Sequence, residues 1–246
     1  MRARARALGR RLAEVLFPSR CAHCETPLHG APNAWFCGPC WAAVGLSAGA
    51  LCDRCGIPIP ASHAVAGWCC ADCIKRPPAF AAARVLGPYD GPLGAALRLL
   101  KYHGRTGLAP ALAARLDPSA LPAPFLGVDL VAPVPLHPRR LRERGFNQAG
   151  RLARAVAARL GVAVADDLLA RHGAATSQVG LSRARRLENV RGVFRVPRPQ
   201  RVAGRTVLLV DDVMTTGATA HACAAALVRA GARRVVVWAV ARQGLS

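Results

Sequence analysis

The chain has 246 residues and a formal net charge of +21, because 34 Lys plus Arg face 13 Asp plus Glu. The length suits one large domain with or without a small module. The charge excludes an acidic surface and favours a polyanionic partner, while an apolar fraction of 52% excludes wholesale disorder. Only Lys75 and Lys101 are lysines, so almost all basic residues are arginines.

Segment 1–20 carries six Arg and one Glu around a short apolar run at 12–17. We expect a basic amphipathic helix here, and a basic arm that touches a polyanion is the alternative. The run is too short to span a membrane, and no small-residue cleavage site follows it. The sequence therefore predicts no transmembrane segment and no signal peptide, which favours a cytoplasmic protein.

Nine of the ten cysteines lie between residues 21 and 73, and eight of them form four Cys-x-x-Cys pairs. Each pair can aim two thiolates at one point, and two pairs complete a tetrahedron around Zn²⁺. We predict a double zinc ribbon over 21–76 with two structural Zn²⁺ ions, because four thiolates leave no open position for a substrate. The predicted ligands are Cys21, Cys24, Cys37, Cys40, Cys52, Cys55, Cys70 and Cys73.

Three points about these cysteines stay open from the sequence. A disulfide framework is the alternative to zinc, although nothing in the sequence indicates an oxidising compartment. Cys69 adjoins Cys70, and we choose Cys70 because it alone keeps the two-residue gap to Cys73. Spacing does not tell whether the two halves form separate ribbons or exchange their Cys-x-x-Cys pairs.

The pattern changes after a Pro- and Arg-containing linker at 75–78. Strand and helix patterns then alternate, which predicts an α/β domain with a parallel sheet over 80–246. We expect a strand at 84–89, a helix at 93–102, a strand at 129–134, a Pro- and Arg-rich loop at 135–146, a helix capped by Asn147 that runs to Arg159 and stops at Gly161, a mobile loop at 171–189, a buried strand at 206–210, a helix at 218–230 closed by Gly231, and a buried strand at 235–240.

The segment 207–219 carries the most informative chemistry. A buried strand leads into Asp211 and Asp212, and a turn of hydroxyl residues and Gly217 then enters a helix. In open α/β sheets ligands bind beyond the carboxyl ends of strands, and a helix N-terminus attracts phosphate. The two carboxylates suit vicinal ribose hydroxyls, so the segment predicts a phosphorylated ribose. The alternative is that Thr216 or Thr219 only caps the helix and that the Asp pair is a metal site or a solvated turn.

This segment resembles the phosphoribosyl pyrophosphate (PRPP) motif of type I phosphoribosyltransferases, and nearly the whole chain resembles the ComF/ComFC family. That family joins a cysteine-rich zinc module to such a domain. The chain departs from the family pattern at Arg185 and at 187–188. Besides the Cys pairs and the Asp pair, the matching motifs are Leu-Lys-Tyr-His-Gly at 100–104, Val-Pro-Leu at 134–136, Arg-Gly-Phe-Asn-Gln at 144–148, Gln178, Gly-Leu-Ser-Arg at 180–183, Arg186 and Asn-Val-Arg-Gly at 189–192.

The resemblance implies a parallel-sheet, type I phosphoribosyltransferase-like domain that binds PRPP together with Mg²⁺. It implies that Asp211 and Asp212 are catalytic residues that hold the ribose hydroxyls and that the turn cradles the 5′-phosphate. It also places Arg183 and Arg186 on a loop that closes over the site and takes part in catalysis, and the 135–144 segment against the pyrophosphate. The other PRPP-binding residues that it implies are Lys101, Arg144, Val213, Thr215, Thr216, Gly217, Ala218 and Thr219.

Two classes of function follow, an enzyme and a binding protein. The first is an enzyme that transfers the phosphoribosyl group of PRPP to an acceptor that the sequence does not identify. The resemblance also links such proteins to single-stranded DNA handling in natural transformation, with a DNA-uptake helicase or other competence proteins as partners. The alternatives are a non-catalytic DNA-binding competence factor and a regulator that senses PRPP without turnover.

Overall fold

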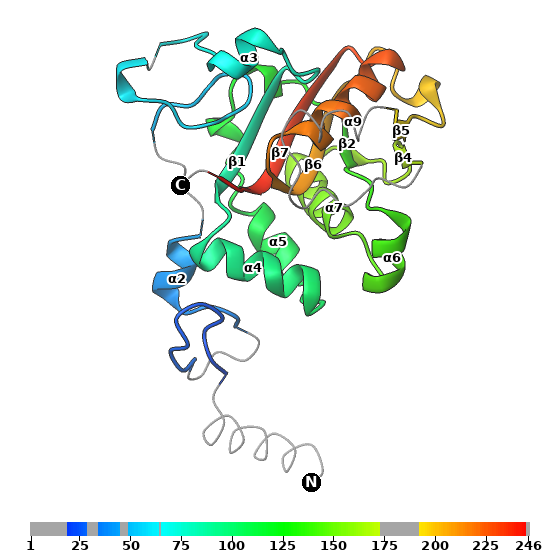
Figure 1. Ribbon diagram of the computed structural model, residues 1–246. Helices are drawn as coiled ribbons and strands as arrows, with labels where there is room; N and C mark the ends of the chain where they lie inside the picture. Colours follow the sequence, from blue (N-terminus) through cyan, green and yellow to red (C-terminus); the bar gives the residue numbers. More distant parts are fainter. Residues whose placement is uncertain (1–18, 29–33, 45–48, 64, 173–191, 245–246) are drawn as a thin grey trace.

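The structure is a computed structural model that describes residues 19–28, 34–44, 49–63, 65–172 and 192–244. Its centre is a five-stranded, all-parallel sheet in the order β1-β7-β6-β2-β3 (Figure 1). β6 and β7 lie in the middle, and their apolar runs suit strands that are covered on both faces. The strands are β1 (Ala82–Pro88), β2 (Leu130–Pro133), β3 (Ala163–Val164), β6 (Thr206–Met214) and β7 (Arg234–Arg242).

Helices cover both faces of this sheet, as the predicted α/β class requires. Successive side chains of a strand point to opposite faces. Leu208 and Val210 of β6 therefore pack with α4 (Gly91–Tyr102), α5 (Leu108–Ala113) and α7 (Gln148–Leu160). The intervening residues of β6 pack on the other face with α9 (Ala218–Arg229), which Figure 1 shows across β6 and β7.

The chain between these elements forms short pieces of secondary structure. A small antiparallel pair, β4 (Ala170–Arg171) and β5 (Phe194–Arg195), lies beside α9. None of the helices in the described part of the chain has the length and hydropathy needed to cross a bilayer. The short 3₁₀ helices are Ala61–His63, Pro118–Ala120, Ala123–Phe125 and Pro199–Arg201.

The predicted caps of α7 are confirmed. The Asn147 side chain accepts a hydrogen bond from the Ala149 amide at 3.1 Å, and its own amide group donates to the Val134 carbonyl. The helix ends at Gly161, whose φ of 66° lies in the left-handed region that glycine adopts without strain. Local sequence signals therefore fix both ends of this helix.

The loop predicted at 135–146 is wrong, because it contains the helix α6 (Pro138–Arg144). Proline stands at its first position, where a missing N–H costs nothing. The His137 side chain accepts a hydrogen bond from the Arg139 amide, and Arg139 pairs at 2.8 Å with the glutamate one turn later. Gly145 closes the helix with a φ of 75°. Because the segment is rich in Pro and Arg, its composition favoured a loop, although it contains these capping signals.

The strand predicted at 206–210 is also too short. β6 continues to Met214, because Asp211 pairs with Ala239 of β7 and Met214 pairs with Arg242. The two aspartates therefore lie inside a strand rather than in the turn that follows it. The predicted loop at 171–189 lies outside the described residues from 173 onwards, and so does most of the basic segment 1–20.

The cysteine-rich region forms two small units that dock on the α/β domain in different ways. In the first unit, Cys21, Phe36 and Cys40 join the apolar cluster of α4 and α5, near the short helix α2 (Gly38–Ala42). In the second unit, the Arg54 carbonyl accepts a hydrogen bond from the Ala83 amide of β1. Its helix α3 (Ala71–Lys75) lies well apart from α2 (Figure 1).

Candidate functional site

The two aspartates of β6 lie beside a turn that leads into α9. The Asp211 carboxylate accepts a hydrogen bond from the Asp212 amide at 2.8 Å, and Asp212 accepts one from the Val213 amide at the same distance. Gly217 has a φ of 77° and precedes the first residue of α9, where the backbone of other residues would be strained. The Thr216 hydroxyl accepts a 3.4 Å hydrogen bond from the Ala218 amide, so the helix cap proposed as an alternative is present in part.

Lys101 at the end of α4 forms a buried ion pair with Asp212. The Lys101 Nζ atom lies 2.6 Å from Asp212 Oδ2, and the two side chains are 13% and 8% exposed. The same ammonium group lies 5.5 Å from the centre of the Tyr89 ring, which adds a cation–π contact. The fold thus brings together Lys101 and Asp212, whose motifs are far apart in the sequence.

The environment separates the acidities of the two carboxyl groups. Burial raises the pKa of Asp211 well above its ordinary value, and the neighbouring Asp212 carboxylate adds to the rise. Burial also raises the pKa of Asp212, but the Lys101 charge and its hydrogen bond outweigh this effect, so the pKa lies below the ordinary value. Asp212 is therefore the ionised member of the pair, and Asp211 binds a proton more readily.

Arg144, the last residue of α6, contacts the end of α4. Its guanidinium carbon lies 5.1 Å from the centre of the exposed ring of Tyr102, the residue after Lys101. Arg144 thus lies beside the residue that follows Lys101, although α6 and α4 are separate in the sequence. The catalytic residues predicted at Arg183 and Arg186 lie outside the described residues.

The remaining predicted residues follow the strand and the helix. Val213 lies within β6, Thr215 to Gly217 form the turn, and Ala218 and Thr219 occupy the first turn of α9. The site thus combines carboxylate acceptors, the Lys101 cation and the N-terminus of a twelve-residue helix. Carboxylates can accept hydrogen bonds from sugar hydroxyls, and a helix N-terminus offers free N–H groups to phosphate. This arrangement is able to hold a phosphorylated sugar.

The eight predicted metal ligands form two separate groups of four. Within each group the sulfur atoms lie within 4.8 Å of one another, and the groups follow chain order, Cys21 to Cys40 and Cys52 to Cys73. The two halves therefore do not exchange their Cys-x-x-Cys pairs. Cys69 belongs to neither group, and each of the cysteines, all of which lie in the described part of the chain, is free of disulfide bonds.

Both groups fit structural zinc. A tetrahedral ion with bonds of about 2.3 Å places its sulfurs about 3.8 Å apart. Two of the sulfur pairs lie at 3.5 Å, for Cys24 with Cys37, and at 3.7 Å, for Cys55 with Cys70. Burial raises the pKa of Cys52, but backbone N–H groups that point at its sulfur have the larger, opposite effect. The pKa therefore lies at about 7, below its ordinary value. In the same group, burial raises the pKa of Cys55 to about 11, so the protein itself stabilises the thiolate that zinc requires at Cys52 but not at Cys55.

Two arginines that the sequence motifs did not indicate attach the second zinc unit to the sheet domain. Arg84 of β1 donates to the Asp53 carbonyl at 3.1 Å. Arg242, at the end of β7 and only 6% exposed, donates to the Cys55 carbonyl and, at 3.4 Å, to the Thr215 carbonyl. Arg242 thus bridges a zinc ligand and the turn after β6. A charged residue at the end of an apolar run was the only sequence signal for it.

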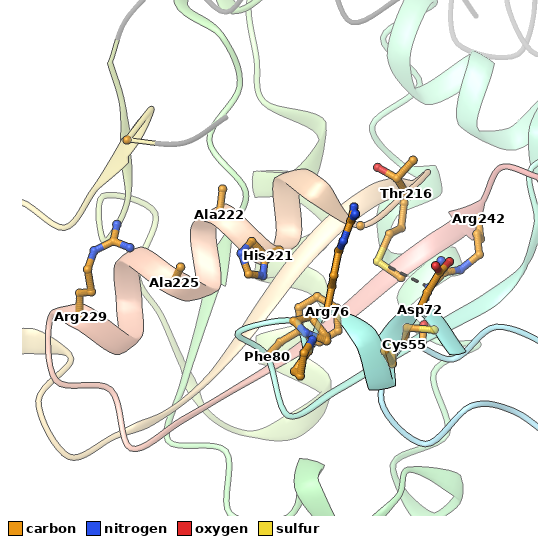
Figure 2. A pocket seen from close by; sticks show the side chains of 16 residues that line it. Cys55, Asp72, Arg76, Phe80, Thr216, His221, Ala222, Ala225, Arg229 and Arg242 are labelled. Atoms are coloured by element: carbon orange, nitrogen blue, oxygen red, sulfur yellow. Dashed lines mark hydrogen bonds between the residues drawn. The ribbon is translucent and has the colours of Figure 1, made fainter. Parts of the chain in front are cut away.

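A cavity of about 500 Å³ lies between α9 and the second zinc unit (Figure 2). One wall comes from the α3 region and the linker that follows it, and the other from one flank of α9, which is distant in the sequence. Thr216 and Gly217 of the turn line it as well. Sequence reasoning missed this cavity because it exists only where the zinc unit docks on the sheet domain.

Comparisons with known proteins agree with this architecture. A model of the double zinc ribbon domain matches residues 12–76, and a model of the phosphoribosyl transferase domain matches residues 146–244. The DNA utilization protein YhgH of Salmonella typhi is 35% identical over 92% of this chain and 97% of its own length. The Competence protein F of Haemophilus influenzae is 28% identical over 92% of this chain and 98% of its own.

The chain belongs to the ComF family. The parallel sheet with its flanking helices is accordingly the family's phosphoribosyltransferase-type domain, and the two tetracysteine units are its double zinc ribbon. Among solved structures, a glutamine PRPP amidotransferase from B. subtilis, complexed with ADP and GMP, matches 55% of this chain and 25% of its own. The identity is 24% and the TM-score 0.35, so this match adds nothing to the assignment.

Proposed function

We propose that this ComF-family protein binds PRPP with Mg²⁺ at the end of β6 and transfers its phosphoribosyl group to a nitrogen nucleophile. We further propose that it acts in the cytoplasm in the handling of single-stranded DNA during natural transformation. The observation that carries the first part is the pair Asp211–Asp212 next to a glycine-containing hydroxyl turn at the start of α9. The names of two relatives, a DNA utilization protein and a competence protein, support the second part.

The residues have distinct parts in this proposal. Asp211 and Asp212 accept hydrogen bonds from the ribose hydroxyls, and the backbone from Val213 to Thr219 holds the 5′-phosphate. Lys101 lies in the last turn of α4, and Arg144 contacts the neighbouring Tyr102. In the proposal both face the negative charge of the pyrophosphate. Arg183 and Arg186 keep their predicted place on the closing loop.

The reaction is a substitution at the anomeric carbon of the sugar. The nucleophile forms a bond from nitrogen to that carbon while the bond from the carbon to the pyrophosphate oxygen breaks, and the nucleophile loses a proton. Mg²⁺ would supply neutralising charge to the leaving pyrophosphate. The protein's own contribution is to orient the sugar and to exclude water, because water competes with the nucleophile.

Calorimetry with PRPP and Mg²⁺ tests the binding site. We expect the intact protein to bind, and we expect the double variant Asp211→Asn with Asp212→Asn to lose measurable binding because both acceptors for the ribose are weakened. Asp117→Asn removes an exposed carboxylate elsewhere and serves as the control. Unchanged binding by the double variant would reject the site.

A screen for pyrophosphate release then tests turnover. PRPP is offered with nucleobases and amines, with and without single-stranded DNA, and release above the rate without acceptor identifies the acceptor class. PRPP binding without release for any acceptor would favour the second candidate, a DNA-binding factor that senses PRPP. The net charge of +21 and the two zinc units favour that candidate independently of catalysis.

A further inference from the structure

The cavity beside α9 is an elongated groove with a defined course. Figure 2 shows Arg229 at one end of the exposed flank of α9 and Cys55, Asp72 and Arg242 at the other. The helix of twelve residues that forms one wall is about 18 Å long. The opposite wall is the second zinc unit with its linker, from which Arg76 points toward α9. A groove of this length has room for a few nucleotides rather than for a single small ion.

The lining of the groove combines positive charge with apolar surface. Arg76, Arg229 and Arg242 line it against one carboxylate, Asp72. The Arg76 and Arg229 side chains are exposed. Prolines of the linker, Phe80, Met214 and alanines of α9 supply the apolar part of the lining. A single strand binds without sequence preference in a positively charged groove that follows its phosphates. The aromatic residue that lines this groove, Phe80, is only 3% exposed, so the lining is suited to the phosphates rather than to stacking of the bases.

His221 of α9 adds a fixed neutral donor to the groove. Its Nδ1 atom accepts a hydrogen bond from the Ala79 amide at 3.0 Å, which requires that nitrogen to carry no proton. Burial, with a further contribution from Arg229, lowers the pKa of His221. The neutral ring then carries its proton on Nε2 and is able to donate to a phosphate or a base edge.

The position of the groove excludes the phosphoribosyl acceptor as its occupant. Thr216 and Gly217, which belong to the turn proposed for the 5′-phosphate, line the groove. The described residues that line it do not include Asp211, Asp212 or Lys101, which are proposed for the sugar and the pyrophosphate. In the proposed placement of PRPP, the groove meets the phosphate end of the molecule, away from the reacting carbon, so we assign the groove to a second ligand.

We infer that this groove holds the backbone of single-stranded DNA, which runs along α9 from Arg229 to the turn at Thr216. The inference rests on the proposed function, because it takes DNA as the polyanion that the protein handles. It also predicts coupling, since strand and PRPP share the two turn residues. If PRPP changes the affinity for the strand by some factor, the strand changes the affinity for PRPP by the same factor.

Fluorescence anisotropy with a labelled oligo-dT strand, titrated over a range of salt, tests the groove. For single strands the logarithm of the affinity falls with the logarithm of the salt concentration by about 0.7 per phosphate contact. The variant Arg76→Gln with Arg229→Gln should therefore bind more weakly and lower this slope by about 1.4. Arg151→Gln on α7, which removes an exposed arginine from the other face of the sheet, is the matched control and should keep both values.

A second variant changes shape without changing charge. Ala225→Trp would fill the groove from α9, whereas Ala158→Trp places the same side chain on an exposed position of α7. We expect at least a tenfold loss of strand affinity only for Ala225→Trp. PRPP calorimetry and zinc content, measured on each variant, show whether the fold and the proposed PRPP site are kept.

The possible outcomes distinguish failure of the groove assignment from failure of the proposed DNA handling. Salt-dependent oligo-dT binding that is equal in the groove variants and the controls would overturn the groove while the proposed DNA handling stands. No oligo-dT binding by the unaltered protein at low salt would overturn both, although PRPP binding would still stand or fall on its own calorimetry. Strand affinity that is identical with and without PRPP would overturn the coupling.

Discussion

The ion pair between Lys101 and Asp212 gives the sharpest test of the site. Lys101→Met keeps the length and apolar volume of the side chain but removes its charge. The pair has a separation of 2.6 Å and side chains that are only 13% and 8% exposed, so the variant leaves a buried carboxylate without its cation. Removal of one partner from a buried pair costs about 3–5 kcal/mol. At about 2–4 °C per kcal/mol for a chain of this size, the melting temperature should fall by roughly 10 °C.

The loss of stability in Lys101→Met should depend on pH, because it arises from the charge of Asp212. In the unaltered protein the pKa of Asp212 in the folded state lies below its unfolded value, so its contribution is present above the unfolded pKa and is lost as the pH falls through the folded pKa. Without Lys101, burial still raises the pKa of Asp212, and only the hydrogen bonds with Asp211 and the Val213 amide still lower it. We therefore expect its folded pKa to lie above the unfolded value. The sign then reverses, and the variant should lose less stability on acidification than the unaltered protein does.

Urea unfolding between pH 4 and pH 8 measures both effects. The pKa of Asp211 is raised in the folded state, so its contribution to stability is lost as the pH rises through that pKa. Because both proteins contain Asp211, the test is the difference between the stability curve of the variant and that of the unaltered protein. Lys75→Met, at the only other lysine and exposed on α3, is the control. Asp212→Asn added to Lys101→Met should restore most of the lost stability, because no buried charge is left. A loss below about 1 kcal/mol at pH 7, or curves of the same slope, would refute the reasoning.

Three further predictions follow from the zinc units and from α7. Cys52→Ser should reduce the bound zinc from about two ions per chain to about one, whereas Cys69→Ser should leave two; equal zinc content in both would contradict the ligand set. Arg242→Met should weaken PRPP binding at unchanged zinc content, because it frees the turn after β6, and Arg234→Met at the other end of β7 should not; the two are compared by calorimetry. Asn147→Ala removes the cap of α7 and should lower the free energy of unfolding by about 1–2 kcal/mol in urea, and an unchanged value would show that the cap is not needed.

The features that the sequence predicted well are those whose causes are local in the chain. Asn147 and Gly161 fixed the two ends of α7 because a cap needs only its own neighbours. The four Cys-x-x-Cys pairs indicated two zinc sites because each pair already holds two ligands together. Alternation of strand and helix patterns was enough to predict the α/β class. The missed helix α6 was local too, but its proline and arginines concealed the signals.

Other features depended on partners that the chain brings together only on folding. β6 extends through Asp211 and Asp212 because β7 pairs with it as far as Arg242. Lys101 meets Asp212 because α4 ends beside the carboxyl end of β6, so the sharing of charge between the two aspartates is a property of the tertiary structure. No pattern in either segment contains that information.

The sequence by itself determined that this is a ComF-family chain, with zinc ligands in pairs and an acidic strand followed by a hydroxyl turn. Only the tertiary structure decided how these parts are joined. The groove beside α9 and the Arg242 bridge both depend on where the second zinc unit docks, and Arg242 and Cys55 are 187 residues apart in the chain. Motifs record what each segment can bind, whereas the distances and burial that set charge, acidity and coupling arise between segments.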